Sequence, residues 1–400
     1  MRGLYLWLAL LLLTGCAAMR PGLGVESPYV DPRTLHVGQI LHLATGRLLA
    51  ESEALDYLCR FPVVYVGEQH DNVEAHAVQL TVLKAMEACF PGQVTLGLEM
   101  LERPFQADAD AFVRGEMSER DFRRRWQKSW GDISYHRDLL RFALEKRIPL
   151  LALNASAATR KAVREQPPAA MTPDAAREVP ELDAQDPYYR AYVEAMAGGH
   201  PGGVGADALY RVQLLWDETM ASTAAEYLKS PAGRGRRLLV LAGSNHVRYG
   251  LGIPRRLFRR IPLPFVIVEP YVYAAGVAVS KDRLMEVDVP APPLRPADLY
   301  WAVQYRDLKG EQVKLGIMVQ DGDGAGVRVT GVLPGGPGHA AGLLAGDLIV
   351  AVDGVEVAAA SDLIEEVGRH KRGENGTIEV LRGGVHVPLV VTYDVVAPGH

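Results

Sequence analysis

The chain has 400 residues, of which 48% are apolar and 23% are charged, and its formal net charge is −5. This length and composition suit two or three globular domains, and the small negative charge argues against general nucleic-acid binding. We therefore expect a folded protein that does not bind nucleic acid.

Residues 1–16 are predicted to be a lipoprotein signal peptide. Arg2 provides a positive charge, residues 4–13 form a short apolar run, and Leu13-Thr14-Gly15-Cys16 resembles a lipobox. The run is too short to span a bilayer comfortably and ends in a cleavage-type site. An ordinary secretory signal with an incidental cysteine is the alternative. We expect lipidation of Cys16 and anchoring in the cell envelope, at the outer membrane facing the periplasm in a two-membrane bacterium.

Residues 17–33 contain Pro and Gly with few apolar runs and are predicted to be a tether. From residue 34 to residue 305, short apolar strands alternate with helical segments. The predicted strands cover residues 61–67, 94–98, 149–153, 237–242 and 265–268. Continuously apolar strands separated by helices are typical of an α/β fold, with a mainly parallel sheet covered by helices on both faces.

Once Cys16 is lipidated, Cys59 and Cys89 are the remaining cysteines. Each lies at the end of a helical stretch, just before a predicted strand. An exported protein can form a disulfide, but the sequence does not supply the geometry. A disulfide and two separately buried thiols therefore both stay open.

Polar side chains follow the predicted strands at the ends where parallel α/β sheets place their sites. Two of these turns share the pattern Gly-x-x-His, from Gly67 to His70 and from Gly243 to His246. Glycine permits a tight turn there. Two imidazoles and a carboxylate would suit a first-row transition metal. We predict a metal site formed by His70, Glu99 and His246, with Glu68 and His76 nearby.

Each of these residues also has a structural interpretation. Glu68 or Glu99 could cap a helix N-terminus, where a carboxylate is favourable. His76 could be a ligand, a partner of a ligand or a buried structural histidine.

Four motifs make the region from 34 to 303 resemble the ChaN family of the Tiki-type superfamily. They are Val66-Gly67-Glu68-Gln69-His70-Asp71-Asn72, Leu98-Glu99-Met100, Trp216-Asp217-Glu218-Thr219-Met220-Ala221 and Ala242-Gly243-Ser244-Asn245-His246 with Gly252-Ile253-Pro254. The resemblance implies haem binding and a role in haem or iron uptake. It also implies kinship with metal-dependent peptidases that use paired Gly-x-x-His motifs and an acidic residue.

Haem ligation in this family involves a tyrosine, and non-covalent haem needs an axial Tyr, His or Met. The sequence alone does not identify which residue would be the axial ligand. Arg211 and Arg248 could pair with haem propionates, although solvated surface arginines are the alternative. The candidate ligands are Tyr188, Tyr189, Tyr192 and Tyr210, for each of which ordinary packing is the alternative.

After a polar linker at 306–311, residues 312–394 resemble a PDZ domain. The motifs that carry this resemblance include Leu315-Gly316-Ile317-Met318 and Ala345-Gly346-Asp347-Leu348-Ile349. We expect the amides around Leu315, Gly316 and Ile317 to hold the carboxylate of a peptide that adds to the strand starting at Ile317. The helix near residues 361–369 would form the other wall, with Leu363 or Ile364 facing inward. A degenerate module that only packs on the large domain is the alternative.

Two functions of different class follow from these observations. One is an envelope lipoprotein that binds haem or another iron compound, with the PDZ domain binding the C-terminal peptide of a partner. The other is a metal-dependent hydrolase, in which Glu68, His70, Glu99 and His246 would be catalytic and a divalent metal would replace haem. A scaffold with a vestigial site and a homodimeric assembly are further alternatives.

Overall fold

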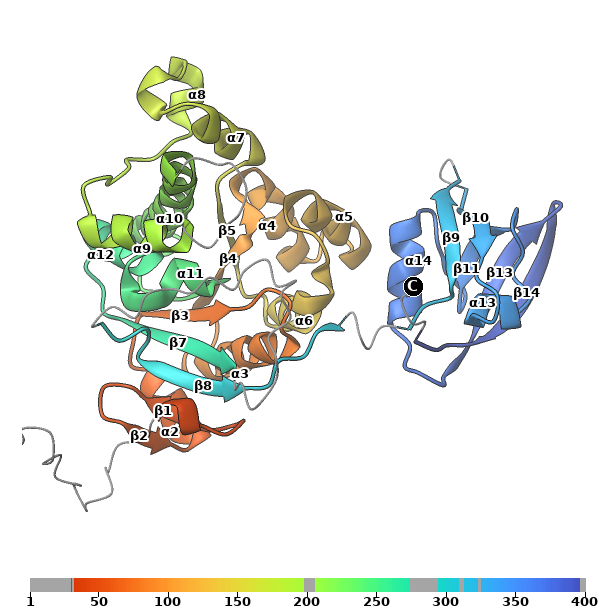
Figure 1. Ribbon diagram of the computed structural model, residues 1–400, viewed down its shortest axis with the longest axis horizontal. Coiled ribbons are helices and arrows are strands. Elements are labelled where there is room, and N and C mark those ends of the chain that lie inside the picture. The colour runs from red at the N-terminus through yellow and green to blue at the C-terminus, as the bar shows by residue number, and fades with distance from the viewer. Residues whose placement is uncertain are drawn as a thin grey trace, which may run out of the picture.

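The computed structural model describes residue 30 and residues 32–197, 206–272, 294–308, 313–322 and 325–395 of the chain. A large α/β domain is followed by a smaller β-rich domain (Figure 1). The predicted signal peptide, with Cys16, lies outside the described residues. Within the part of the chain that is described, no helix combines the length and apolar character needed to cross a membrane.

The large domain is built on a mainly parallel sheet, as the sequence predicted. Within the described residues this sheet has eight strands in the order β2-β1-β8-β7-β3-β6-β4-β5. Strands β8 to β5 in this order run parallel to their neighbours, and β1 and β2 add an antiparallel hairpin at one edge. The strands are β1 (Ile40–His42), β2 (Arg47–Leu49), β3 (Val63–Glu68), β4 (Val94–Glu102), β5 (Leu150–Asn154), β6 (Arg237–Gly243), β7 (Phe265–Val272) and β8 (Leu299–Val303).

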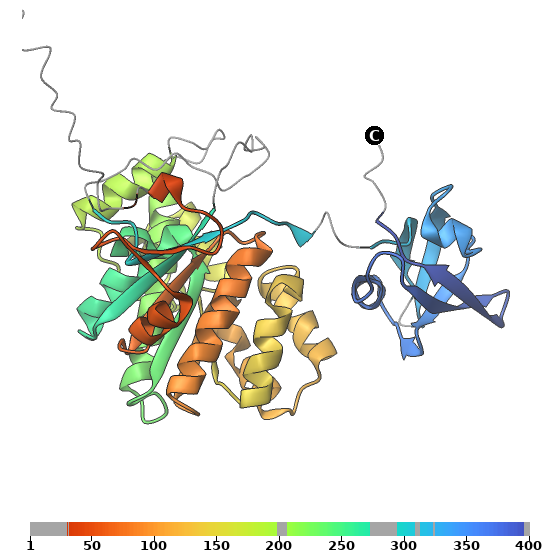
Figure 2. The same cartoon turned by 90° about the horizontal axis from the view of Figure 1, so that it is seen from below.

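Helices cover both faces of this sheet (Figure 2). The helices that cover the faces are α3 (Val73–Cys89), α4 (Gln106–Arg114), α5 (Glu119–Ser129), α6 (Arg137–Lys146), α10 (Ala206–Lys229) and α12 (Ile253–Arg260). One core gathers residues of the first four of these helices with α2 (Glu51–Leu58), and the other gathers α10 and α12. The remaining helical segments are η1 (Pro32–Thr34), η2 (Arg103–Phe105), η3 (Ile133–His136), α7 (Ala157–Glu165), η4 (Pro168–Ala170), α8 (Pro173–Arg177), α9 (Pro187–Ala197), α11 (Ser244–Val247) and η5 (Arg248–Gly250).

Strand β3 shows why the sheet needs cover on both sides. Val64 and Val66 belong to the core under α3, whereas Val63 and Tyr65 belong to the core under α10 and α12. Successive side chains of a strand point to opposite faces, so an apolar run is buried only between two layers. This strand therefore lies in the centre of the domain and carries its last residue, Glu68, to a buried position at the sheet edge.

Cys59 and Cys89 form a disulfide that ties the end of α2 to the end of α3. Of the two alternatives that the sequence left open, the structure has the bonded one. The bridge joins two helices that pack on the same face of the sheet, next to the hydrophobic core.

The smaller domain is a twisted antiparallel sheet with strand order β14-β13-β11-β10-β9, and β12 pairs with β11. Leu363 is buried in its core, whereas Ile364 is 65% exposed, so Leu363 is the residue that faces inward. The elements are β9 (Ile317–Asp321), β10 (Val327–Val332), α13 (Pro337–Ala340), β11 (Leu348–Val352), β12 (Val355–Glu356), α14 (Ala360–Gly368), β13 (Asn375–Arg382) and β14 (Val385–Thr392).

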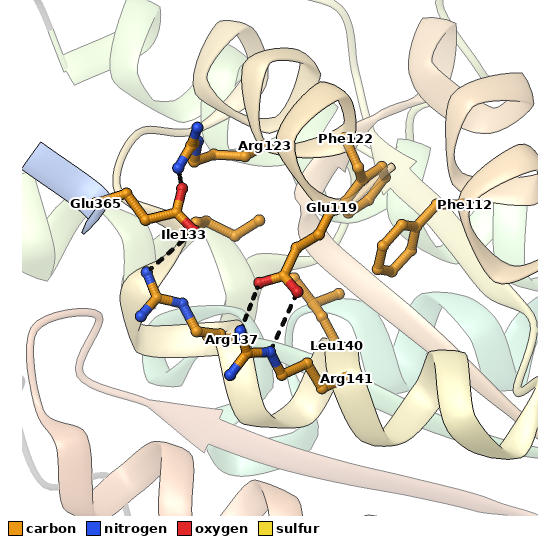
Figure 3. A pocket seen from close by; sticks show the side chains of 9 residues that line it. All are labelled: Phe112, Glu119, Phe122, Arg123, Ile133, Arg137, Leu140, Arg141 and Glu365. Atoms are coloured by element: carbon orange, nitrogen blue, oxygen red, sulfur yellow. Dashed lines mark hydrogen bonds and ion pairs between the residues drawn. The ribbon is translucent and has the colours of Figure 1, made fainter. Parts of the chain in front are cut away.

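Acidic side chains of α14 contact arginines of the large domain. Arg123 of α5 donates to the Asp362 carboxylate at 2.8 Å and also contacts Glu365, and Arg137 lies 3.8 Å from Glu365. Figure 3 shows Glu365 directed toward both arginines. Arg123, Asp362 and Glu365 are all buried. The two domains therefore meet through buried ion pairs.

Candidate functional site

The polar strand ends predicted from the sequence lie side by side in the sheet. Glu68 at the end of β3 pairs in register with Gly243 at the end of β6. Strand β4, the next neighbour of β6, carries Glu99 before it ends at Glu102. Asn154 closes β5 and donates to the backbone oxygen of Glu99 at 2.9 Å. The carboxyl edge of the sheet therefore gathers two buried glutamates beside the second Gly-x-x-His turn.

Glu99 and His246 form one group at this edge. Glu99 Oε1 lies 3.3 Å from His246 Nε2, and Glu99 Oε2 accepts a hydrogen bond from the Gly243 amide at 2.6 Å. On the other side of the imidazole, Nδ1 lies 2.6 Å from Asp217 Oδ1. Asp217 in turn accepts a hydrogen bond from the Tyr189 hydroxyl. The imidazole is thus held between two buried carboxylates.

The contacts between His246 and its two carboxylates shift the pKa values of both His246 and Glu99. Burial alone would lower the pKa of His246, but the charges of Glu99 and Asp217 outweigh burial and hold that pKa well above its usual value. Burial alone would raise the pKa of Glu99, but His246 and His70 hold it below its usual value. The fold therefore favours the charged forms of both His246 and Glu99.

Asp217 was not among the candidate site residues that the sequence predicted. It lies in the middle of α10, inside the Trp216-Asp217-Glu218 motif that supported the family resemblance. The signal in the sequence is the adjacent acidic pair Asp217 and Glu218 in a helix with an apolar stripe, and the structure buries both residues.

His70 follows β3, the parallel neighbour of β6, and its ring lies against Gly243 at the end of β6. Its Nδ1 is 2.6 Å from Glu68 Oε1, and its ring atoms Cε1 and Nε2 lie 3.0 Å from the position that a Cβ on Gly243 would take. Burial favours the neutral ring, but the hydrogen bond and charge of Glu68 and the charge of Glu99 raise the pKa of His70. His70 keeps 25% of its side chain exposed and packs edge-on against Trp130.

The two motif glycines serve a different purpose from the one expected. Neither Gly67 nor Gly243 has a positive φ, so the turns do not require glycine for its backbone freedom. A Cβ on Gly67 would lie 2.5 Å from Glu269 Oε2, and one on Gly243 would touch His70. Glycine is needed because functional side chains pass directly over the backbone at both positions.

A second group of metal-ligand type lies on the other side of Glu68. Glu68 Oε2 is 3.5 Å from His76 Nδ1 and 3.6 Å from His136 Nε2, and the three ligand atoms lie within 4.8 Å of one another. His136, the last residue of η3, was missing from the sequence prediction. No strand or turn motif surrounds His136 in the sequence, and it joins the site only through its tertiary contact with Glu68.

The candidate tyrosines lie in different surroundings. Tyr188 is 65% exposed. The other three are buried, and their hydroxyl groups already have partners: Tyr189 donates to Asp217, Tyr192 lies 3.5 Å from Asn245 Oδ1, and Tyr210 donates to the Ala184 carbonyl.

The two arginines considered for haem propionates also have partners. Arg211 donates to the backbone oxygens of Val163 and Arg164. Arg248 donates to the buried carboxylate of Glu269, whose charge is the largest influence that raises the pKa of Arg248. Either arginine would have to share its guanidinium with these groups.

In the smaller domain, the Leu315-Gly316-Ile317 loop precedes the edge strand β9. Gly316 has a φ of +67°, a conformation that favours glycine. Its carbonyl accepts from the Leu333 amide, and the Leu315 carbonyl accepts from the Gly338 amide. Since β9 pairs on one side with β10 and ends the sheet order on the other, its outer edge can take an added strand.

Comparisons with known proteins agree with this division into two domains. Residues 55–257 match the family model described as haem-binding uptake, Tiki superfamily, ChaN, and residues 313–392 match the PDZ domain model. A solved structure described as cofacial heme binding to ChaN of Campylobacter jejuni matches with a TM-score of 0.50 and 16% identity. The match covers 66% of this chain and 95% of that chain. At this identity the structural match shows the shared fold.

Shorter matches are to bacterial proteases. The HtrA-type protease AlgW with a decapeptide is 28% identical over 25% of this chain and 32% of its own, with a TM-score of 0.21. A serine endoprotease from Yersinia pestis is 24% identical over 21% of this chain and 29% of its own, with a TM-score of 0.19. No curated protein matches the chain.

Proposed function

Because the chain belongs to the ChaN family of haem-binding uptake proteins in the Tiki superfamily, we propose that it binds haem in the cell envelope. In this proposal Cys16 carries the lipid anchor, the large domain binds haem or another iron compound for uptake or handling, and the PDZ domain binds the C-terminal peptide of a protein partner. The family model over 55–257 is the observation that carries the haem assignment.

The residues present can be tested against what haem requires. A haem iron needs an axial nitrogen, oxygen or sulfur atom that it can reach, beside apolar or aromatic surface. His70 offers such a nitrogen, because Glu68 occupies its Nδ1, 25% of its side chain is exposed and the ring contacts Trp130. A carboxylate on the far nitrogen is a common support for an iron-bound histidine.

Among the tyrosines, Tyr188 fits best. Its ring is 65% exposed, whereas the hydroxyls of Tyr189 and Tyr210 are buried and bonded to other groups. Binding haem through those two would break existing hydrogen bonds and require the surrounding helices to open. We therefore propose His70 or Tyr188 as the axial ligand of haem. Haem would supply the iron centre, and the protein would supply the ligand and the aromatic wall.

An absorption titration with haem tests this proposal. The wild-type protein should shift the Soret band on binding, and loss of that shift in Tyr188→Phe or in His70→Ala would identify the axial ligand. Tyr210→Phe is the matched control, because it removes a hydroxyl that is bonded to a backbone carbonyl. A wild-type protein that leaves the Soret band of free haem unchanged would contradict the proposal.

Metal-dependent hydrolysis is the second candidate, favoured by the meeting of His70, Glu99 and His246 around Gly243. Their imidazoles and carboxylate would suit a divalent metal, which could activate water for hydrolysis. Metal-dependent cleavage of peptides by the wild-type protein, lost in His246→Asn, would favour this function over haem binding.

A further inference from the structure

Three buried side chains form a second cluster beside the pair of Gly-x-x-His turns, and this cluster shares Glu68 with the first turn. Glu68 ends β3, His76 lies in the first turns of α3, and His136 ends η3. All are at most 5% exposed. Three separate elements therefore deliver one carboxylate and two imidazoles to a single buried point beneath the sheet edge.

The spacing of these groups matches that of ligands around one ion. Glu68 Oε2 lies 3.5 Å from His76 Nδ1 and 3.6 Å from His136 Nε2. A tetrahedral ion with bonds of about 2.0–2.1 Å separates its ligand atoms by roughly 3.4 Å. The observed distances are too long for good hydrogen bonds and close to this ligand-to-ligand spacing.

His136 provides an independent observation. Within the described residues neither of its ring nitrogens has a hydrogen-bond partner, although the side chain is 1% exposed. The ring packs between His76 and Trp126, with centroid distances of 4.4 and 5.2 Å. Buried polar atoms are nearly always satisfied, so an imidazole that makes no hydrogen bond and lies 3.6 Å from a carboxylate points to a missing ligand.

Gln79 currently bridges two of the ligands. Its amide nitrogen donates to Glu68 Oε2 at 2.6 Å, and its oxygen lies 3.0 Å from His76 Nδ1. An ion would replace the contact between Gln79 and His76, and the Gln79 oxygen would then be available as a fourth ligand. Gln79 is fully buried, so it would remain beside the ion.

We infer that Glu68, His76 and His136 bind a divalent first-row transition metal, Zn²⁺ or Fe²⁺, at a buried structural site. Two imidazoles and one carboxylate suit these ions better than Ca²⁺ or Mg²⁺, which prefer oxygen ligands. Because Glu68 Oε1 holds His70 while Oε2 faces the proposed ion, the metal would fix the orientation of His70. The inference does not depend on haem binding.

Metal analysis of the haem-free protein tests the site. After loading with Zn²⁺ and removal of excess metal, the wild-type chain should retain about one ion, as a closed structural site does. His136→Leu should retain almost none, while His339→Ala, which removes an exposed imidazole from the smaller domain, should behave as the wild type. Circular dichroism of each variant reports whether the fold is kept.

The stability of the apo protein separates a metal ligand from a merely buried histidine. Loss of a structural ion should lower the melting temperature of the wild type on treatment with EDTA and leave His136→Leu insensitive to EDTA. If His136 only packs, His136→Leu should keep the wild-type metal content and be equally stable or more so, which would overturn the inference.

Two further measurements test whether the metal binds at His136 or at the Gly-x-x-His pair. Co²⁺ added to the apo wild-type protein should give the visible absorption of a four-coordinate site, a measurement that needs no variant. Metal that is lost in His246→Asn but kept in His136→Leu would place the ion at the Gly-x-x-His pair instead and overturn the assignment. Haem titration of His136→Leu should still shift the Soret band if the haem proposal is correct, so the two proposals can fail separately.

Discussion

The carboxylate of Glu99 contacts both ends of the second Gly-x-x-His turn: one oxygen lies 3.3 Å from Nε2 of His246, and the other accepts the amide of Gly243. Since His70 packs over the same glycine, this carboxylate is near both imidazoles. Residues that are far apart in the chain therefore form one electrostatic unit at the carboxyl edge of the sheet.

Stability should depend on pH through His246. Its pKa is raised in the folded protein, so its stabilising contribution is complete below the unfolded value near 6.5 and is lost as pH rises through the folded pKa. We expect the difference in unfolding free energy between wild type and His246→Asn to fall by up to about 1.4 kcal/mol per pH unit above that value. Urea denaturation between pH 6 and pH 9 measures this difference.

A matched comparison identifies the source of that dependence. Asp217→Asn removes one of the two carboxylates that flank the imidazole, so it should flatten the pH profile without abolishing it. His339→Ala, at an exposed position, should leave the profile of the wild type unchanged. A difference between wild type and His246→Asn that grows with pH would have the wrong sign for this mechanism.

Removing the disulfide should destabilise the large domain. The bond between Cys59 and Cys89 closes a loop with a sequence separation of 30. Chain-entropy arguments for such a loop give roughly 3–4 kcal/mol. The double variant Cys59→Ala/Cys89→Ala should therefore unfold at lower denaturant concentration than the oxidised wild type. Dithiothreitol should lower the stability of the wild type and not that of the variant; equal sensitivity of both would exclude this role.

The smaller domain should bind peptides at one edge of its sheet only. Ile317 starts β9, and a charge there, as in Ile317→Glu, should abolish binding of C-terminal peptides to the full-length chain. Val390→Glu is the control, because Val390 is 69% exposed on β14, at the opposite end of the strand order. Fluorescence anisotropy with peptides that carry a free or an amidated C-terminus tests both points.

Either of two results would contradict this prediction. Equal affinity for free and amidated peptides would show that no carboxylate is recognised. Equal loss of binding in both variants would show that the substitutions act through the fold rather than through the edge strand.

The lipid anchor predicted at Cys16 can be tested by fractionation. Cys16→Ser should release the protein from membranes or block its processing, because acyl chains on Cys16 would hold it there. Mass spectrometry of the mature wild-type protein should show a modified cysteine as its first residue. An unmodified N-terminus elsewhere would contradict the anchor.

The sequence predicted the parallel sheet and the convergence of its strand ends because both follow from short-range patterns. Apolar runs such as Val63–Val66 mark buried strands, and parallel strands end at the same edge. The hairpin β1–β2 and the strand β8 were not predicted. Strands β1 and β2 have three residues each, too few to show a pattern, and β8 directly follows a Pro-rich segment.

Residues that act through tertiary contacts were harder to find. His136 reaches Glu68 from η3, and Asp217 reaches His246 from the centre of α10. Neither follows a strand or a glycine turn, so the search for polar strand ends does not find either residue. Gly243 was predicted to permit a tight turn, but its φ is not positive. Glycine is needed there because the His70 ring packs closely on it, which the sequence pattern cannot show.

That close approach leads to the last prediction. A Cβ on Gly243 would lie 3.0 Å from His70 Cε1 and Nε2 and 3.6 Å from Glu99 Oε2, so Gly243→Ala should push the His70 ring away. Overpacking of this kind costs about 1–3 kcal/mol, less than the whole stability of a domain. The variant should fold, with ligand binding that depends on His70 weakened. Gly368→Ala is the control, since a Cβ there meets nothing within 4 Å and alanine favours a helix. Denaturation measures the loss of stability, and haem titration measures the loss of affinity for haem. A Gly243→Ala protein with wild-type stability and wild-type haem affinity would show that the Cβ does not displace the His70 ring.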